Sequence, residues 1–169
     1  FLDGARIPWA NRVTNLASNE EYRHTVSMLA AAYAHKGHKV LVVSDRVAFL
    51  KSCAELTGEK ALCVTGEIPQ EERERLINEL RFGNKNVLYG TQAIFSEGIS
   101  INELSCLILG TPINNEPLLT QLIGRIIRKE ENKLTPVIID IHLKGDTARR
   151  QASNRVGYYM KQGYQIKEL

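Results

Sequence analysis

The sequence predicts an α/β domain in which a parallel sheet is covered by helices on both faces. Two observations support this prediction. Short runs of apolar and often β-branched residues are apolar almost throughout, which is typical of strands that are buried on both faces. These runs alternate with stretches of helical periodicity, as in folds built from a parallel sheet and its flanking helices. The expected strands are 39–44, 61–64, 86–90, 104–110 and 136–141.

Helices are expected between and around these strands. In the first of them, apolar Val26, Leu29, Ala30 and Tyr33 share one face. We expect an irregular linker over 1–19, the main domain over 20–142, and a basic helical extension of the same domain over 143–169, with a candidate short edge strand at 164–168. The expected helices are 20–36, 46–56, 70–82, 117–128 and 147–162.

Length and composition indicate a globular domain. The chain has 169 residues, of which 43% are hydrophobic and 24% charged, and these values exclude wholesale disorder and a collagen-like fibre. No apolar run reaches the roughly 18 residues that a membrane span needs. The start resembles no signal peptide and lacks an initiator methionine, so we expect a fragment of a longer chain. A net charge of +3 is too small to indicate nucleic-acid binding by itself.

The three cysteines, Cys53, Cys63 and Cys106, predict buried free thiols in a reducing compartment. Each cysteine has apolar neighbours in sequence, and their number is odd. No pair of Cys or His residues has the spacing of metal ligands, so we predict no metal site.

The C-terminal tail is rich in basic residues. Tyrosines lie between them, so this segment either contacts DNA or packs its tyrosines on the sheet, and packing is the favoured interpretation. The basic residues are Lys144, Arg149, Arg150, Arg155, Lys161 and Lys167, and the tyrosines are Tyr158, Tyr159 and Tyr164.

The helix expected at 117–128 carries a narrow polar stripe on an otherwise apolar surface. Pro117 suits its first turn, and Gln121, Gly124, Arg125 and Arg128 follow at spacings that place them on one face. We expect this stripe to be partly buried, and the glycine to mark a close approach of another backbone. Buried arginines need an anion or carboxylates. The alternative is an amphipathic helix whose arginines pair with the glutamates at 130 and 131.

Ligands of parallel α/β sheets bind beyond the carboxyl ends of the strands. Thr91 and Gln92 follow one expected strand; Thr91 either contacts a ligand there or caps a short helix. Gly98 is either a turn glycine or a point where a ligand comes close. Asp140 ends another strand without a second carboxylate that would suggest a magnesium site. The sequence contains neither G-x-x-x-x-G-K-[ST] nor G-x-G-x-x-G.

Four segments, in order and in register over 36–142, resemble the second RecA-like domain of superfamily 2 helicases. QLIGRIIR resembles motif VI, Q-x-x-G-R-x-x-R, and YGTQAIFSEGISI resembles motif V. KVLVVSDRVAFLKSCAEL resembles motif IV, and TGEIPQEERERLINELRFGNKNVL resembles the segment between motifs IV and V. Motif V and the tail RVGYYMKQGYQI are most similar to phage helicases of the UvsW type, which remodel branched DNA. The resemblance implies a RecA-like three-layer sandwich with a mostly parallel sheet.

The resemblance also implies a nucleotide site. In the family, ATP with Mg²⁺ binds between two RecA-like domains, and the N-terminal one supplies the P-loop and the magnesium carboxylates. Gln121, Arg125 and Arg128 match residues that face the nucleotide, with Arg128 as arginine finger and Arg125 as sensor of the γ-phosphate. Gly98 matches the loop beside the ribose, and Ser100 stands where many relatives have Asp. We therefore expect this chain alone to be inactive as an ATP hydrolase.

A nucleic-acid interface is the third implication. Hydroxyls, backbone N–H groups and an arginine suit phosphate oxygens, which carry no sequence information. Ser44 and Arg46 either join this interface or form a solvated helix start. The implied contacts are Thr91, Gln92, Thr65, Gly66, Ser44 and Arg46.

The function implied is that of a second motor domain in an ATP-dependent DNA helicase or translocase. Such a protein unwinds DNA or migrates branches in recombination, repair or replication, in the cytoplasm of a bacterial or phage-infected cell. Its partners would be single-stranded or branched DNA and the N-terminal RecA-like domain of the same chain. The main alternative is a non-catalytic nucleic-acid-binding or regulatory RecA-like module. An unrelated nucleotide-binding or sugar-binding α/β domain fits the arginine pair and Thr91 less well.

Overall fold

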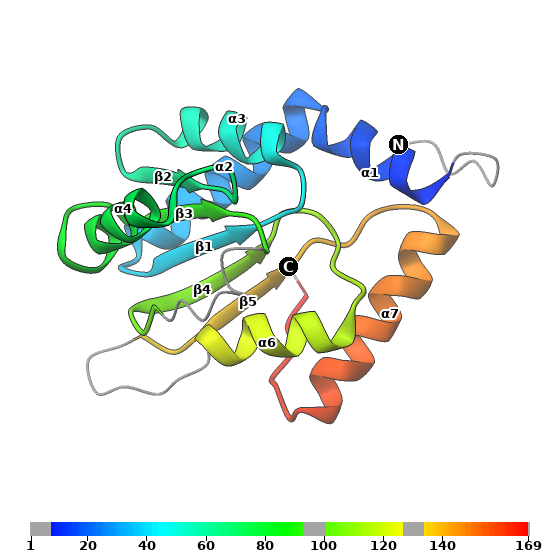
Figure 1. The fold of residues 1–169 in the computed structure, drawn as a ribbon. Helices are drawn as coiled ribbons and strands as arrows, with labels where there is room; N and C mark the ends of the chain where they lie inside the picture. The colour runs from blue at the N-terminus through cyan, green and yellow to red at the C-terminus, as the bar shows by residue number, and fades with distance from the viewer. Residues whose placement is uncertain (1–7, 93–100, 127–133, 169) are drawn as a thin grey trace.

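The computed structural model describes residues 8–92, 101–126 and 134–168, apart from the side chain of Arg125, and is drawn in Figure 1. Its centre is a five-stranded sheet in the order β2-β3-β1-β4-β5, in which every neighbouring pair is parallel. The strands are β1 (Lys39–Val43), β2 (Ala61–Val64), β3 (Val87–Gly90), β4 (Leu104–Leu109) and β5 (Val137–Asp140).

Helices cover both faces of this sheet, so the domain has three layers (Figure 1). Side chains of β1 alternate between the faces. Val40 and Val42 pack in a core cluster with α2 and α3, whereas Leu41 and Val43 pack in a second cluster with α4, α6 and α7. The described helices are α1 (Trp9–Ala17), α2 (Glu20–His35), α3 (Val47–Thr57), α4 (Gln70–Phe82), α6 (Glu116–Ile126) and α7 (Asp146–Lys161).

The predicted sheet is confirmed in all five strands, and the predicted helices begin and end within two residues of the described ones. Pro117 lies in the first turn of α6, as expected. The last two residues of the helix predicted at 117–128 lie outside the described residues. The three-layer, parallel α/β class is therefore confirmed.

The prediction of an irregular segment over 1–19 is wrong for α1. This helix buries Val13, Leu16 and Ala17, and Arg23 of α2 donates a hydrogen bond from Nε to the carbonyl oxygen of Ala17 at 2.7 Å. The residue before the helix is Pro8, which supplies no side-chain cap, and no acidic residue lies in the first turn. The local signals that mark a helix start are therefore absent, and burial against the fold stabilises α1 instead.

The prediction of a short edge strand at 164–168 is also wrong, because the structure has no strand there. Tyr158 and Tyr159 of α7 are buried in the core, and Tyr164 packs against them. Packing of the tyrosines on the sheet is therefore confirmed, while Arg149, Arg150 and other basic residues of the tail are exposed.

The cysteines are free, and Cys53 and Cys106 are buried as predicted, whereas Cys63 is half-buried. Burial raises the pKa of Cys53 to about 11 and that of Cys106 to about 12. Both thiols therefore stay protonated near neutral pH, and a protonated thiol is a poor nucleophile.

Gly110 follows β4 at a point where the chain is tightly enclosed. Its N–H donates to the carbonyl oxygen of Val43 at 2.8 Å, and its own carbonyl oxygen accepts from the hydroxyl of Tyr22 at 2.6 Å. A Cβ at this position would lie 2.9 Å from Cε2 of Phe49 and 3.0 Å from the carbonyl oxygen of Val43. Only glycine fits here without displacing its neighbours.

Gly110→Ala is therefore expected to lower the free energy of unfolding by about 1–3 kcal/mol, the usual cost of overpacking a core. Urea-induced unfolding measures this change. Gly157→Ala is the matched control, since a Cβ there meets no described atom within 4 Å and replaces a glycine inside α7. A Gly110→Ala variant as stable as the unsubstituted chain would contradict the packing described here.

Candidate functional site

The carboxyl ends of β1, β2 and β3 bring together four residues that were predicted as nucleic-acid contacts. Thr65 and Gly66 follow β2, and Thr91 and Gln92 follow β3. The strands end level with one another, since Gly90 pairs with both Val64 and Val43. All four line one open hollow of about 330 Å³, with Asp45, Val47 and Glu67 completing its walls.

Thr91 has the most unusual environment of these residues. Its side chain is 8% exposed, and its Oγ1 is buried without a hydrogen-bond partner in the described part of the chain. Its backbone N–H donates to the carbonyl oxygen of Val64 at 3.4 Å. A buried hydroxyl without a partner costs about 1–3 kcal/mol. A small movement that opened this buried hydroxyl toward the adjoining hollow would let a bound molecule supply the missing partner.

Ser44 is buried, and its hydroxyl is hydrogen-bonded inside the fold. Its Oγ lies 2.7 Å from Oγ1 of Thr111 and accepts a hydrogen bond from the N–H of Arg46 at 3.0 Å. The hydroxyl is therefore used inside the fold, where it joins the ends of β1 and β4. This burial does not fit the alternative of a solvated helix start, and a nucleic-acid contact by Ser44 stays a prediction.

Arg46 directly precedes α3 and is not among the residues that line the hollow. Its Nη2 donates to the carbonyl oxygen of Ala10 in α1 at 3.3 Å, and its Nε lies 3.4 Å from Oδ1 of Asp45. The side chain remains about one-third exposed. A nucleic-acid contact by Arg46 stays a prediction.

Two carboxylates of the hollow, Asp45 and Glu67, were not predicted. Both are more than half exposed; Asp45 faces Arg46, and Oε2 of Glu67 lies 3.8 Å from Nζ of Lys51. Their negative charges disfavour a phosphate beside them. The position of each just after a strand was the signal that could have identified them.

The polar stripe of α6 is more exposed than expected. Leu119, Leu122, Ile123 and Ile126 are buried against the sheet, whereas Gln121 and Gly124 are exposed. A Cβ at Gly124 would meet no described atom within 4 Å, so no close backbone approach in the described chain explains this glycine.

Four predicted nucleotide residues are not placed by the structure. Arg128, Gly98 and Ser100 lie outside the described residues, and the side chain of Arg125 is not described.

Asp140, at the end of β5, forms an ion pair with Arg155. Its carboxylate accepts hydrogen bonds from the guanidinium of Arg155 and from the hydroxyl of Tyr159. In the described ranges, no three His, Cys, Asp or Glu side chains gather in a way that could hold a metal ion. The same ranges contain no helix long and apolar enough to cross a membrane.

Comparison with known proteins adds a family match. Residues 21–130 match the family described as "Helicase conserved C-terminal domain". "Probable helicase D10" of Escherichia phage T5 is 42% identical over 161 residues, which cover 94% of this chain and 36% of that protein. "ATP-dependent DNA helicase uvsW" of Enterobacteria phage T4 is 23% identical over 158 residues, covering 92% and 31%. This chain thus spans about a third of the length of these relatives.

A solved structure shows the same fold. The crystal structure of T4 UvsW matches with a TM-score of 0.76 at 18% identity, over 93% of this chain and 36% of that one. The parallel five-stranded sheet with its helices is thus the RecA-like arrangement that the sequence predicted.

Proposed function

Since this chain belongs to the family of helicase conserved C-terminal domains and is of the UvsW-like phage type, we propose that it is the second motor domain of an ATP-dependent DNA helicase or translocase. DNA is proposed as the substrate because the T4 relative is named a DNA helicase. Unwinding or branch migration, in recombination, repair or replication, belongs to the same proposal.

The observation that carries the proposal is the hydroxyl of Thr91 beside the hollow. Oγ1 has no described partner, and a phosphate oxygen of a nucleic-acid backbone would accept a hydrogen bond from this hydroxyl. Thr65, Gly66 and Gln92 line the same hollow, where Gly66 and Gln92 are accessible to such a backbone and Thr65 is 2% exposed. Asp45 and Glu67 line the same hollow and would repel a phosphate placed beside them, but both are more than half exposed, so solvent screens their charges.

The exposed stripe of α6 supports a nucleotide-facing role. Gln121 and Gly124 are open to a partner on that side of the helix. We assign Arg125 and Arg128 to the same side from their spacing, with Arg128 as the arginine that stabilises charge on the transferring phosphoryl group. Gly98 and Ser100 are assigned to the ribose.

ATP with Mg²⁺ would be held mainly by an N-terminal RecA-like domain of the longer protein. Closure of the two domains on ATP would move one DNA contact relative to the other, and nucleotide state would thereby drive translocation. We accordingly expect this chain without that domain to hydrolyse no ATP.

Thr91→Val is expected to weaken binding of single-stranded DNA by about tenfold to a hundredfold, because a charge-assisted hydrogen bond contributes about 1.5–3 kcal/mol. Valine keeps the shape of threonine and removes only the hydroxyl. Fluorescence anisotropy of labelled DNA with the full-length protein measures the change, and ATP binding should be unaltered.

Two controls accompany this test. Thr91→Ser retains the hydroxyl and should bind DNA as the unsubstituted protein does. Thr25→Val removes an exposed hydroxyl of α2 that donates to the carbonyl oxygen of Glu21, and it should have no effect. Equal DNA affinity in Thr91→Val and Thr25→Val would remove Thr91 from the interface.

A further inference from the structure

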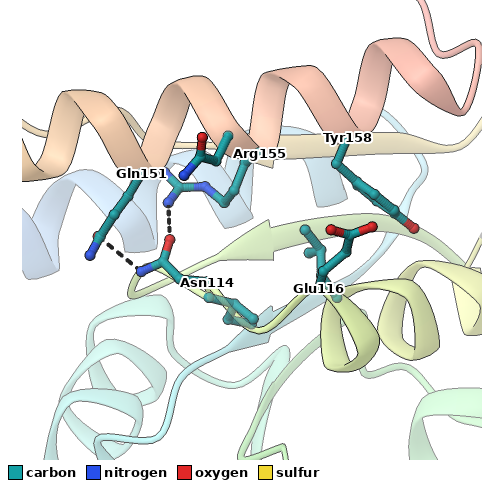
Figure 2. A pocket seen from close by; sticks show the side chains of 8 residues that line it. Asn114, Glu116, Gln151, Arg155 and Tyr158 are labelled. Carbon is teal, nitrogen blue, oxygen red and sulfur yellow. Dashed lines mark hydrogen bonds between the residues drawn. The ribbon is translucent and has the colours of Figure 1, made fainter.

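A buried arginine of α7 is bonded to the segment that leads into α6. Arg155 is 5% exposed. Its Nε and Nη2 donate to the two carboxylate oxygens of Asp140 at 2.8 and 3.0 Å, and its Nη1 donates to Oδ1 of Asn114 at 2.7 Å. Gln151, one turn earlier on α7, accepts from Nδ2 of the same asparagine at 2.9 Å (Figure 2). The amide oxygen and the amide nitrogen of Asn114 are thus both hydrogen-bonded to side chains of α7.

Asn114 stands immediately before the residue that caps α6. Oδ1 of Asn115 accepts a hydrogen bond from the N–H of Leu118 at 3.1 Å, and Leu119 N–H donates to the carbonyl oxygen of Asn115 at 2.9 Å. The contacts of Arg155 and Gln151 with Asn114 therefore fix the point where α6 begins.

A second contact joins the same two helices one turn further along. The hydroxyl of Tyr158 lies 2.8 Å from Oγ1 of Thr120, which itself donates to the carbonyl oxygen of Glu116 at 2.9 Å. Since the hydroxyl of Thr120 donates its hydrogen bond to that carbonyl, Tyr158 is the donor in the bond between the two hydroxyls. Thr120 directly precedes Gln121, so this bond restrains the rotation of α6 about its axis.

The small pocket between these side chains has a volume of about 80 Å³ (Figure 2). Ligand sites for drug-sized molecules are typically about 300–1,000 Å³, so this space is too small for a nucleotide. The guanidinium of Arg155, the amide of Asn114 and the hydroxyl of Tyr158 are already hydrogen-bonded to protein. The cluster acts on α6 rather than on a ligand of its own.

We propose that Arg155, Asn114 and Tyr158 are positioning residues for nucleotide hydrolysis, which hold α6 in the orientation that presents its polar face to ATP. This inference rests on the proposed function, because it assumes that α6 carries the residues that face the nucleotide. Misplacing a reacting group by about 1 Å can cost about 10²-fold in rate, so small shifts of α6 would reduce turnover.

The test measures ATP hydrolysis by the full-length protein at saturating single-stranded DNA and over a range of ATP concentrations. The assay temperature lies well below the melting temperature of the protein. Asp140→Asn with Arg155→Met removes the ion pair without leaving a buried charge, while the amide still accepts from Tyr159. Tyr158→Phe removes only the hydroxyl that reaches Thr120. Arg75→Met is the matched control, since this exposed arginine of α4 pairs with Glu72 and Glu79 of its own helix.

We expect kcat to fall about tenfold in the double variant and about threefold in Tyr158→Phe. The KM for ATP should match that of the unsubstituted protein within error, and so should the melting temperature of Tyr158→Phe. Arg75→Met should hydrolyse ATP normally. A purely structural role would lower the melting temperature and leave kcat unchanged, and that result in either variant would overturn the proposal. If the double variant does not fold, Tyr158→Phe decides alone: lowered kcat supports positioning, and unchanged kcat rejects it.

Failure of the proposed function would look different. In that case the unsubstituted protein would hydrolyse no ATP with single-stranded DNA present, and both conclusions would fall together. An active unsubstituted protein with fully active variants would reject the positioning role alone.

Discussion

Arg128→Ala in the full-length protein is expected to reduce DNA-stimulated ATP hydrolysis by about 10³-fold or more, the usual contribution of an arginine finger. A planar guanidinium can donate two hydrogen bonds to the transferring phosphoryl group, and alanine supplies neither charge nor donor. The steady-state rate at saturating ATP and DNA measures the loss, and circular dichroism should show an unchanged fold.

Arg75→Ala controls for the removal of an arginine as such. Arg75 is exposed on α4 and forms exposed ion pairs within its own helix, 3.5 Å from Glu72 and 3.4 Å from Glu79, so its loss should leave turnover unchanged. If Arg128→Ala retained turnover comparable to that of Arg75→Ala, the nucleotide-facing assignment of α6 would be wrong.

Arg155→Met alone is expected to lower the free energy of unfolding by about 3–5 kcal/mol, since removing one partner leaves a buried charge without compensation. Asp140 is only 9% exposed and receives two hydrogen bonds from this guanidinium. The hydroxyl of Tyr159 would remain as a donor, yet it carries no charge. Urea-induced unfolding at neutral pH measures the effect.

Asp140→Asn combined with Arg155→Met should recover most of the lost stability, because no charge is then left buried. Arg75→Met, which breaks exposed ion pairs, should change the free energy of unfolding by less than about 1 kcal/mol. Equal stability of Arg155→Met and Arg75→Met would contradict the buried ion pair.

The sheet was predictable because the local sequence of each strand is enough to identify it. Leu104–Leu109 is buried at every position, and a run that is apolar at every position but Ser105 is the direct sequence signature of such a strand. Helix α1 was not predictable in this way, since Pro8 provides no capping side chain and the helix depends on contacts with α2.

The hollow followed from topology, because the carboxyl ends of parallel strands meet at one edge of the sheet. Thr65 and Thr91 therefore lie together although 26 residues separate them, and both line the hollow. The burial of the Ser44 hydroxyl was not predictable, because its partner, Thr111, is 67 residues away in sequence. Asp140 likewise finds Arg155 only through the packing of α7. Long-range hydrogen bonds of this kind leave no periodic trace in a sequence.

The account is tested most directly by ATP hydrolysis of the full-length protein, measured without nucleic acid and with single-stranded DNA, branched DNA or single-stranded RNA. We predict that DNA strongly raises ATP turnover by the full-length protein. A preparation of this chain alone should show no ATP turnover. Turnover that is absent, or equal with and without nucleic acid, would contradict the motor and favour a non-catalytic nucleic-acid-binding or regulatory module.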